Sequence, residues 1–162
     1  MIKTSVVILN WNGAELIKKF LPTVLKHTQS ADCEVVVADN HSSDNSVEVL
    51  MSQFPPVKLI LLDKNYGFAE GYNRAMKEVT AKYVVLLNSD IETTHNWLEP
   101  LIDHLENNPD TAAVQPKILS YTDKSKFEYA GAAGGFIDRY GYPFCRGRIL
   151  NFLENDWGQY DN

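Results

Sequence analysis

Short runs of consecutive apolar residues alternate along the chain with segments in which apolar residues recur every three or four positions. The runs span residues 5–9, 34–38, 59–62 and 83–87. Unbroken runs of this length are typical of parallel strands buried on both faces, and the intervening spacing is typical of amphipathic helices. Because strand and helix alternate four times, the pattern predicts an α/β fold with a doubly wound, mostly parallel sheet.

The helical spacing covers residues 16–25, 47–54, 67–79 and 97–105. Pro22 stands inside the first of these segments and predicts a kink or a restart of that helix. After residue 116 the sequence becomes rich in Tyr, Phe, Gly and charged residues without a sustained period, which predicts hairpins and long loops. We therefore expect a βα core over residues 1–116 and an extension over residues 117–162 that something else would cover.

Charge and cysteine content narrow the functional classes. The formal net charge is −6 and the sequence pI is about 5.1, which argues against nucleic acid or an anionic membrane surface as a partner. Cys33 and Cys145 match no zinc spacing and are expected to be reduced thiols in the cytoplasm. The apolar runs are too short to predict a signal peptide or a membrane span.

Each predicted strand ends on Asn or Asp. Residues Asn10, Asp39, Asp63 and Asn88 stand at these four ends. The carboxyl ends of parallel strands meet at one edge of a sheet, where open α/β folds bind ligands. The sequence therefore predicts that these polar residues form one rim at the carboxyl edge of the sheet. Because the chain is acidic, an anionic ligand bound there would need positive charge from a metal, a helix N-terminus or a single cationic side chain.

Asn88-Ser89-Asp90 has the spacing of a D-x-D metal motif with Asn in the first place. Alternate side chains at a strand end point to the same side, so Asn88 and Asp90 can share a ligand. One carboxylate suits Mg or Mn when phosphates and waters complete the octahedron. The alternative is that Asp90 only turns the chain, because Asn, Ser and Asp are common turn residues.

Asp39 and Trp11 are the candidates for contact with a nucleoside. A carboxylate at the end of a strand commonly accepts hydrogen bonds from a ribose hydroxyl or a base N–H. The alternative is that Asp39 caps the following helix, although Ser42 or Ser43 in that role would leave Asp39 free. Trp11 can stack on a base or simply pack against the protein.

Residues 64–74 join a strand to a helix, with two glycines and Arg74 one turn into the helix. The segment is neither a G-x-G-x-x-G fingerprint nor a Walker loop. It offers a backbone that can approach a ligand closely, a helix N-terminus and a guanidinium able to bind phosphate. The alternative is that these residues form an ordinary surface helix without a ligand. The four histidines of the chain share no spacing, and none of them is assigned to catalysis.

Four segments, at residues 6–13, 36–44, 65–73 and 86–90, together strongly resemble glycosyltransferase family 2. Enzymes of this family are inverting, have a Rossmann-like GT-A fold and use nucleotide-diphosphate sugars. The resemblance covers essentially the whole chain in order. The opening Asn-Trp-Asn-Gly and the Asn-x-Asp variant look most like the rhamnosyltransferase-like branch.

The resemblance implies a substrate-binding role for a set of matching positions: Asn10, Trp11 and Asn12 at the base, Asp39 with Asn40 and Ser42 at the nucleoside, Asn65, Gly67 and Phe68 along the nucleotide, Asn73 and Arg74 near the diphosphate, and Gly134 and Gly135 near the donor sugar. Asp90 matches the metal-binding aspartate, with Mg or Mn as the cofactor. Asn88 departs from the usual aspartate, and a hydrogen bond to ribose or to a metal-bound water is expected there instead.

A second departure concerns catalysis. The family resemblance implies a downstream acidic pair as the general base, and we find none. Residues 154–157 contain Glu154 and Asp156 but are interpreted as a loop. An inverting transfer needs a carboxylate that takes the proton of the acceptor hydroxyl. We therefore expect residues 1–116 to bind the nucleotide sugar and the whole fold to be truncated. The chain would then be the donor-binding fragment of a longer enzyme, and it would be inactive when isolated.

The resemblance also implies an acceptor and a location. The acceptor is expected to be a saccharide or a lipid-linked saccharide in polysaccharide or cell-surface glycan synthesis. The full-length protein is expected in the cytoplasm, with any association with the inner face of the membrane made through segments outside this sequence. Two alternatives stay open: a sugar nucleotidyltransferase, which would have a Gly-rich basic loop after the first strand, and a non-enzymatic nucleotide-binding or response-regulator-like domain.

Overall fold

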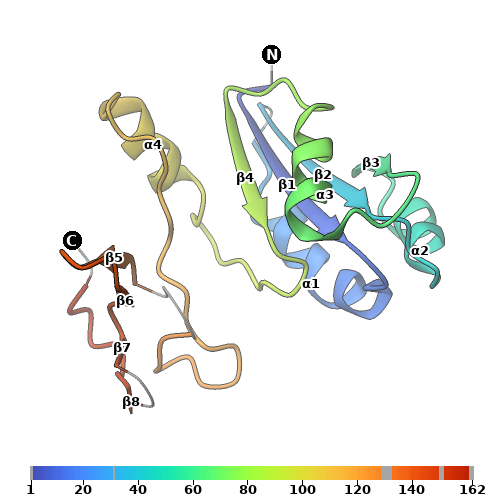
Figure 1. Ribbon diagram of the computed structural model, residues 1–162. Coiled ribbons are helices and arrows are strands. Elements are labelled where there is room, and N and C mark those ends of the chain that lie inside the picture. The colour runs from blue at the N-terminus through green and yellow to red at the C-terminus, as the bar shows by residue number, and fades with distance from the viewer. Residues whose placement is uncertain (1, 31, 129–132, 150–151, 161–162) are drawn as a thin grey trace. The chain divides into compact units, whose positions relative to one another are not determined.

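The computed structural model describes residues 2–30, 32–128, 133–149 and 152–160 (Figure 1). Two compact units divide the chain, Met1–Leu98 and Glu99–Asn162, and each is described by itself. The boundary between these units lies before residue 116. The functional division into a donor-binding core and an extension at that residue stays a prediction.

The first unit contains a parallel sheet of order β3-β2-β1-β4. Its strands are β1 (Thr4–Asn10), β2 (Cys33–Asp39), β3 (Lys58–Leu61) and β4 (Tyr83–Leu87). The apolar runs of the sequence therefore predicted every strand to within one residue at either end. Since all four strands run the same way, their carboxyl ends lie along one edge, as expected (Figure 1).

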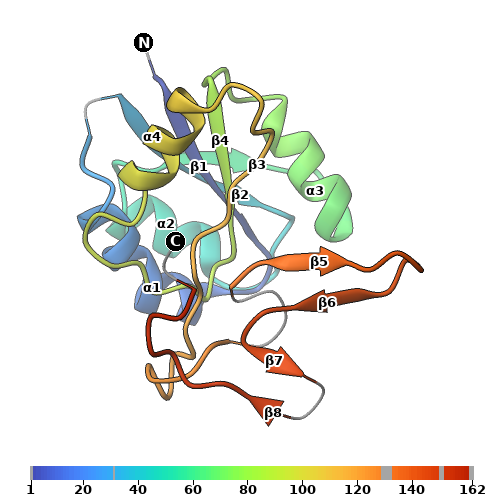
Figure 2. The same cartoon turned by 90° about the vertical axis from the view of Figure 1, so that its left-hand side faces the viewer.

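Helices cover both faces of this sheet (Figures 1 and 2). The chain moves outward from β1 to β3 and then crosses to β4, on the far side of β1. Right-handed connections then place α1 (Ala14–Lys26) and α2 (Ser46–Gln53) on one face and α3 (Gly67–Met76) on the other. The doubly wound, mostly parallel α/β fold is confirmed.

Helix α1 runs through Pro22 as a single helix, so of the two expected effects of this proline the restart does not occur. Pro22 lies on the exposed side, where water can hydrate the carbonyl that loses its helical partner. The opposite side of α1 is held to the sheet by buried Ile17, Phe20, Leu21 and Val24. Packing of this apolar stripe outweighs the hydrogen bond that proline removes.

The second unit contains α4 (Glu99–Asn107) and an antiparallel sheet of four short strands, as the predicted hairpins require. The strands are β5 (Gly135–Ile137), β6 (Pro143–Cys145), β7 (Arg148–Ile149) and β8 (Phe152–Leu153). Phe127 is fully buried and contacts Gly147, where an added Cβ would lie 2.8 Å from its ring. Within the described ranges, no helix is long and apolar enough to cross a bilayer.

Tyr72 of α3 joins the carboxyl ends of β1 and the edge strand β4. The ladder between β1 and β4 ends at the pair Ile8 and Leu87. Beyond that pair, the buried Tyr72 hydroxyl donates a 2.8 Å hydrogen bond to the Leu87 carbonyl and lies 3.5 Å from the Leu9 amide, which donates to it. Burial raises the pKa of the Tyr72 hydroxyl, which keeps it protonated as a donor.

Replacing Tyr72 by Phe is expected to lower the free energy of unfolding by about 1 kcal/mol, because the buried Leu87 carbonyl loses its donor while the ring packing is kept. Urea unfolding followed by circular dichroism measures the change. Tyr142→Phe is the matched control, since Tyr142 is 71% exposed and no hydrogen bond of its hydroxyl is seen in the described part of the chain. Equal stabilities for the two variants would contradict the role given to Tyr72.

Candidate functional site at the carboxyl edge of the parallel sheet

Asp39 and Asn10 form the buried centre of the rim. They are direct partners at the ends of β2 and β1, and Asn10 Nδ2 donates a 2.9 Å hydrogen bond to Asp39 Oδ2. Asp39 is only 2% exposed. Asn10 Oδ1 is also buried and has no hydrogen-bond partner among the described residues. An acceptor without a donor is therefore left at the tip of β1.

Ser42 donates two further hydrogen bonds to Asp39. Its amide donates to Asp39 Oδ1 at 2.8 Å, and its hydroxyl donates to Asp39 Oδ2 at 2.6 Å. The expectation that Ser42 or Ser43 caps α2 and leaves Asp39 free is wrong: α2 begins after Asn45, and Ser42 binds Asp39 itself. Oδ1 accepts one of the two bonds that a carboxylate oxygen can take, so Asp39 keeps capacity for one further N–H or O–H.

Asn12 joins the loop after β1 to the loop after β2. Its backbone has the left-handed value φ 51°, and its Oδ1 accepts hydrogen bonds from the Ser43 amide at 2.7 Å and the Asp44 amide at 3.3 Å. The Asn12 amide donates to Ser42 Oγ at 2.9 Å. The neighbouring Trp11 is 58% exposed, so its indole is open to a planar ligand.

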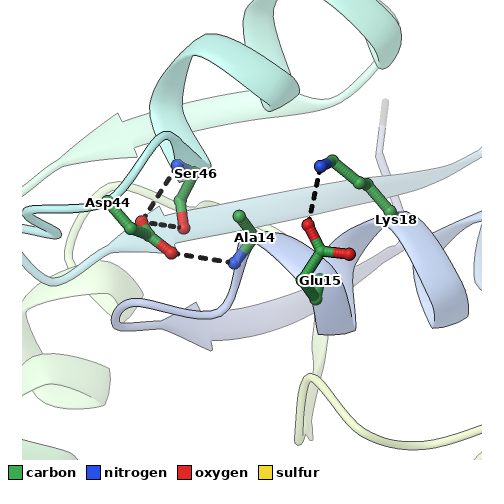
Figure 3. A network of polar contacts seen from close by, with 5 residues as sticks. All are labelled: Ala14, Glu15, Lys18, Asp44 and Ser46. Carbon is green, nitrogen blue, oxygen red and sulfur yellow. Dashed lines mark hydrogen bonds and ion pairs between the residues drawn. The ribbon is translucent and has the colours of Figure 1, made fainter.

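Asp44 joins the beginnings of two helices (Figure 3). One of its oxygens accepts from the Ser46 amide at 2.9 Å and the Ser46 hydroxyl at 2.5 Å, and the other accepts from the Ala14 amide at 3.1 Å. Desolvation raises the pKa of the Asp44 carboxyl, but these hydrogen bonds together hold it below its ordinary value. The sequence analysis did not single out Asp44, although Asp-x-Ser before a helix is a capping signal.

Asn40 binds the loop before α3. Its Oδ1 accepts from the Tyr66 amide at 2.9 Å, and its Nδ2 donates to Asn65 Oδ1 at 3.0 Å and to the Gly67 carbonyl at 2.9 Å. Gly67 begins α3 with φ 71°, a value that favours glycine. Phe68 follows with its ring 67% exposed, in edge contact with Tyr72. Asn40, Asn65 and Gly67 are therefore brought together, and Phe68 is open.

Arg74 contacts Glu70 of its own helix and Tyr66 of the loop before that helix. Its guanidinium lies 3.7 Å from the centre of the Tyr66 ring, and Nε lies 2.8 Å from Glu70 Oε1. A hydrogen bond from the Tyr66 hydroxyl lowers the pKa of the Asp63 carboxyl, which raises the pKa of Tyr66 in turn. Arg74 lines an open cleft along β3, and Asn73 is exposed beside it. Contact of either residue with a diphosphate stays a prediction.

Asn88 and Asp90 follow β4 directly, and both are exposed. No group of three or more His, Cys, Asp and Glu side chains able to hold a metal occurs in the described part of the chain. Mg²⁺ and Mn²⁺ tolerate few protein ligands when waters and phosphates supply the remainder. The side chains present therefore fit a cation that arrives with a diphosphate, and they do not fit a cation enclosed by protein alone.

The remaining sequence candidates lie in the second unit. Gly134 has φ 104°, and nothing lies within 4 Å of a Cβ added to Gly134 or Gly135. Glu154 accepts from the Tyr160 hydroxyl at 2.7 Å, and Asp156 pairs with Lys117 at 2.7 Å, which lowers the pKa of Asp156. As predicted, residues 154–157 are irregular chain, with a single bridge residue. Both carboxylates have structural partners.

Gly13→Ala is expected to lower the free energy of unfolding by about 2 kcal/mol, since the added Cβ would lie 2.4 Å from buried Asn10 Oδ1 and force Asn10 away from Asp39. Thermal unfolding measures this change. Gly135→Ala is the control, because its Cβ meets open space. An unchanged melting temperature for Gly13→Ala would mean that the Asn10 side chain is not held where the structure has it.

Asp44→Asn is expected to cost about 1 kcal/mol at pH 7 through loss of the shared cap. Because the folded pKa lies below the unfolded value of about 3.9, the carboxylate stabilises the fold above that pH, and its contribution is lost as pH falls through the folded pKa. The difference between wild type and Asp44→Asn should therefore shrink between pH 5 and pH 2, measured by urea unfolding. Glu48→Gln, at an exposed position in α2, should show no comparable pH dependence.

Comparison with known proteins places this geometry in a family. The family model described as glycosyl transferase family 2 matches residues 5–157. A poly(ribitol-phosphate) β-N-acetylglucosaminyltransferase, TarP of Staphylococcus aureus, is 34% identical over 115 residues, which are 68% of this chain and 35% of that protein. The chain spans between 24% and 35% of the length of the first curated relatives that it matches.

Two solved structures share the fold. S. aureus TarS 1-349 in complex with UDP-GlcNAc has a TM-score of 0.60 at 19% identity, over 74% of this chain and 38% of that chain. The mannosyltransferase PcManGT of Pyrobaculum calidifontis, in complex with GDP-Man and Mn²⁺, has a TM-score of 0.58 at 22% identity, over 72% and 33%. The parallel sheet and its helices thus form a Rossmann-like GT-A fold, and the chain belongs to glycosyltransferase family 2.

Proposed function

We propose that this chain binds a nucleotide-diphosphate sugar, with a divalent cation, and forms the donor-binding part of an inverting glycosyltransferase of the rhamnosyltransferase-like branch. The observation that carries the proposal is the exposed Asp90 directly after β4, on the edge that also bears the Asn10, Asp39 and Ser42 cluster. The nucleotide sugars bound by TarS and PcManGT, and the Mn²⁺ bound by PcManGT, support the choice of ligand class.

The nucleoside is assigned to the tips of β1 and β2. Asn10 Oδ1 has no donor, and Asp39 Oδ1 can accept one more hydrogen bond, so the pair suits a base N–H or a ribose hydroxyl. The exposed indole of Trp11 supplies an apolar face beside them, and the exposed ring of Phe68 stands at the start of α3. These groups bind and orient the nucleotide.

The diphosphate is assigned to the end of β4. Asp90 would hold Mg²⁺ or Mn²⁺, with Asn88 binding ribose or a metal-bound water. Such a cation, when bound, neutralises the charge that develops on the departing diphosphate. The resemblance also implies contact of Asn73 and Arg74 with the diphosphate, but Arg74 lines a cleft along β3, at the opposite edge of the sheet from β4, so we do not assign it to this position.

Transfer itself is assigned to the longer protein. The incoming hydroxyl of a saccharide or lipid-linked saccharide attacks the anomeric carbon while a carboxylate removes its proton. Glu154 and Asp156 are bound to Tyr160 and Lys117, so neither is assigned as that base. We place the protein in the cytoplasm, which the absence of a disulfide at Cys33 and Cys145 among the described residues supports. We expect no sugar transfer by this chain alone.

Calorimetric titration of the chain with UDP-, dTDP- and GDP-sugars, with and without Mn²⁺, tests the proposal. At least one donor should bind, and Mn²⁺ should strengthen binding. Asp90→Asn should abolish that strengthening, a loss of at least about tenfold in affinity. Asp110→Asn, at an exposed carboxylate of the second unit, should bind as wild type does. No binding of any donor by the folded chain would refute the proposed function.

A further inference from the structure

Both N–H groups of the Asn40 side chain are used in hydrogen bonds inside the protein. Both Nδ2 hydrogens are donated, to Asn65 Oδ1 and the Gly67 carbonyl, and Oδ1 accepts from the Tyr66 amide. Asn40 is only 2% exposed, and its own amide donates to the Asn10 carbonyl at 2.7 Å. A side chain in this state has no N–H left to donate to a ligand.

The three groups that Asn40 binds belong to consecutive residues, from Asn65 to Gly67. Asn65 Oδ1 is shared, because it also accepts from the Gly67 amide at 2.8 Å. Asn40 thereby fixes both the turn and the point at which α3 begins. The exposed Phe68 ring follows at once, so its position relative to β2 depends on this carboxamide.

Helix α3 lies close to β1 and to Asn40, which allows Asn40 to reach the loop before the helix. A Cβ on Gly71 would lie 2.9 Å from Leu9 Cδ2 and 3.3 Å from Asn40 Nδ2. Only a residue without a side chain lets the helix come this near to β1 and to Asn40. The glycine and the carboxamide together hold one turn of α3 against the strand ends.

We infer that Asn40 is a positioning residue for the nucleotide, which holds the Asn65–Gly67 loop and the start of α3 in place and does not contact the ligand. This inference rests on the proposed function for the identity of the ligand. It differs from the role that the sequence implied for Asn40, which was to lie beside the nucleoside as a binding residue.

Asn40→Asp separates the two roles. Aspartate has the same shape but no N–H, so its carboxylate would face Asn65 Oδ1 and the Gly67 carbonyl, both of them acceptors. Repulsion between these oxygens should release the loop while the parallel sheet remains. The control is Asn45→Asp, the same chemical change at an exposed residue whose side chain makes no capping hydrogen bond.

Two measurements on the 162-residue chain test the inference. Amide hydrogen exchange, followed by NMR without ligand, should be about tenfold faster at Tyr66 and Gly67 in Asn40→Asp, with the amides of β1 and β2 unchanged. Calorimetric titration with UDP, dTDP and GDP, each with Mn²⁺, should show roughly tenfold weaker binding of whichever nucleotide wild type binds. Asn45→Asp should match wild type in both.

Each other outcome overturns the inference in a distinct way. Weaker binding with unchanged exchange at Tyr66 and Gly67 would mean that Asn40 contacts the nucleotide directly. Faster exchange with unchanged affinity would mean that the loop does not matter for binding. If wild type binds none of the three nucleotides, the proposed function fails, and the inferred role in nucleotide binding fails with it, whatever the exchange rates.

If circular dichroism shows that Asn40→Asp is unfolded, Asn65→Ala replaces it. Asn65 is exposed, so the core is unaffected, and the change removes one acceptor of Asn40 Nδ2 and the acceptor of the Gly67 amide. Faster exchange at Gly67 and at Tyr66, with roughly tenfold weaker nucleotide binding, supports the inference. Unchanged exchange at Tyr66 would show that Asn40 does not hold the loop through Asn65.

Discussion

The buried carboxylate at the end of β2 sets the arrangement of the loops around it. A charged group that is withdrawn from water must be matched by hydrogen-bond donors, and Asp39 is 2% exposed. Its donors come from two places, the carboxamide of Asn10 and the amide and hydroxyl of Ser42. The end of β1 and the loop after β2 are therefore fixed relative to each other by the need to satisfy one side chain.

The same principle extends along the rim through side-chain oxygens that accept from backbone amides. Asn12 binds the loop after β2, Asp44 binds the first turns of α1 and α2, and Asn40 binds the loop before α3. Loops at the edge of a sheet leave N–H groups without partners, and short polar side chains satisfy them locally. These side chains connect the loops of the rim to one another and to the helices that follow them.

β1 and β2 could be predicted from sequence because a buried parallel strand leaves a continuous run of apolar residues, as in Val35 to Ala38 of β2. The apolar run of β4 also predicted a strand, but the expected burial of both faces is wrong there, because Val84 and Leu86 are 39% and 53% exposed. The partners of the Asn and Asp side chains could not be predicted. Asn12, Asn40 and Asp44 offer the same groups to a ligand and to a backbone amide, and only the fold decides which is within reach. The effect of Pro22 could not be predicted for a similar reason. Whether α1 can continue through a proline depends on which side of the helix faces water.

The polar and aromatic side chains of the rim therefore fall into two groups, those that hold the loops and those that are open to a ligand. Side chains that bind backbone groups of neighbouring loops, such as Asn12 and Asn40, are costly to change because those loops lose the hydrogen bonds that hold them. Side chains that are exposed, such as Trp11, Phe68 and Asp90, can change without that cost. Members of a family that share this rim can therefore exchange exposed groups to suit different nucleotides and sugars, while the carboxamides and Asp39 preserve the shape on which those groups are mounted.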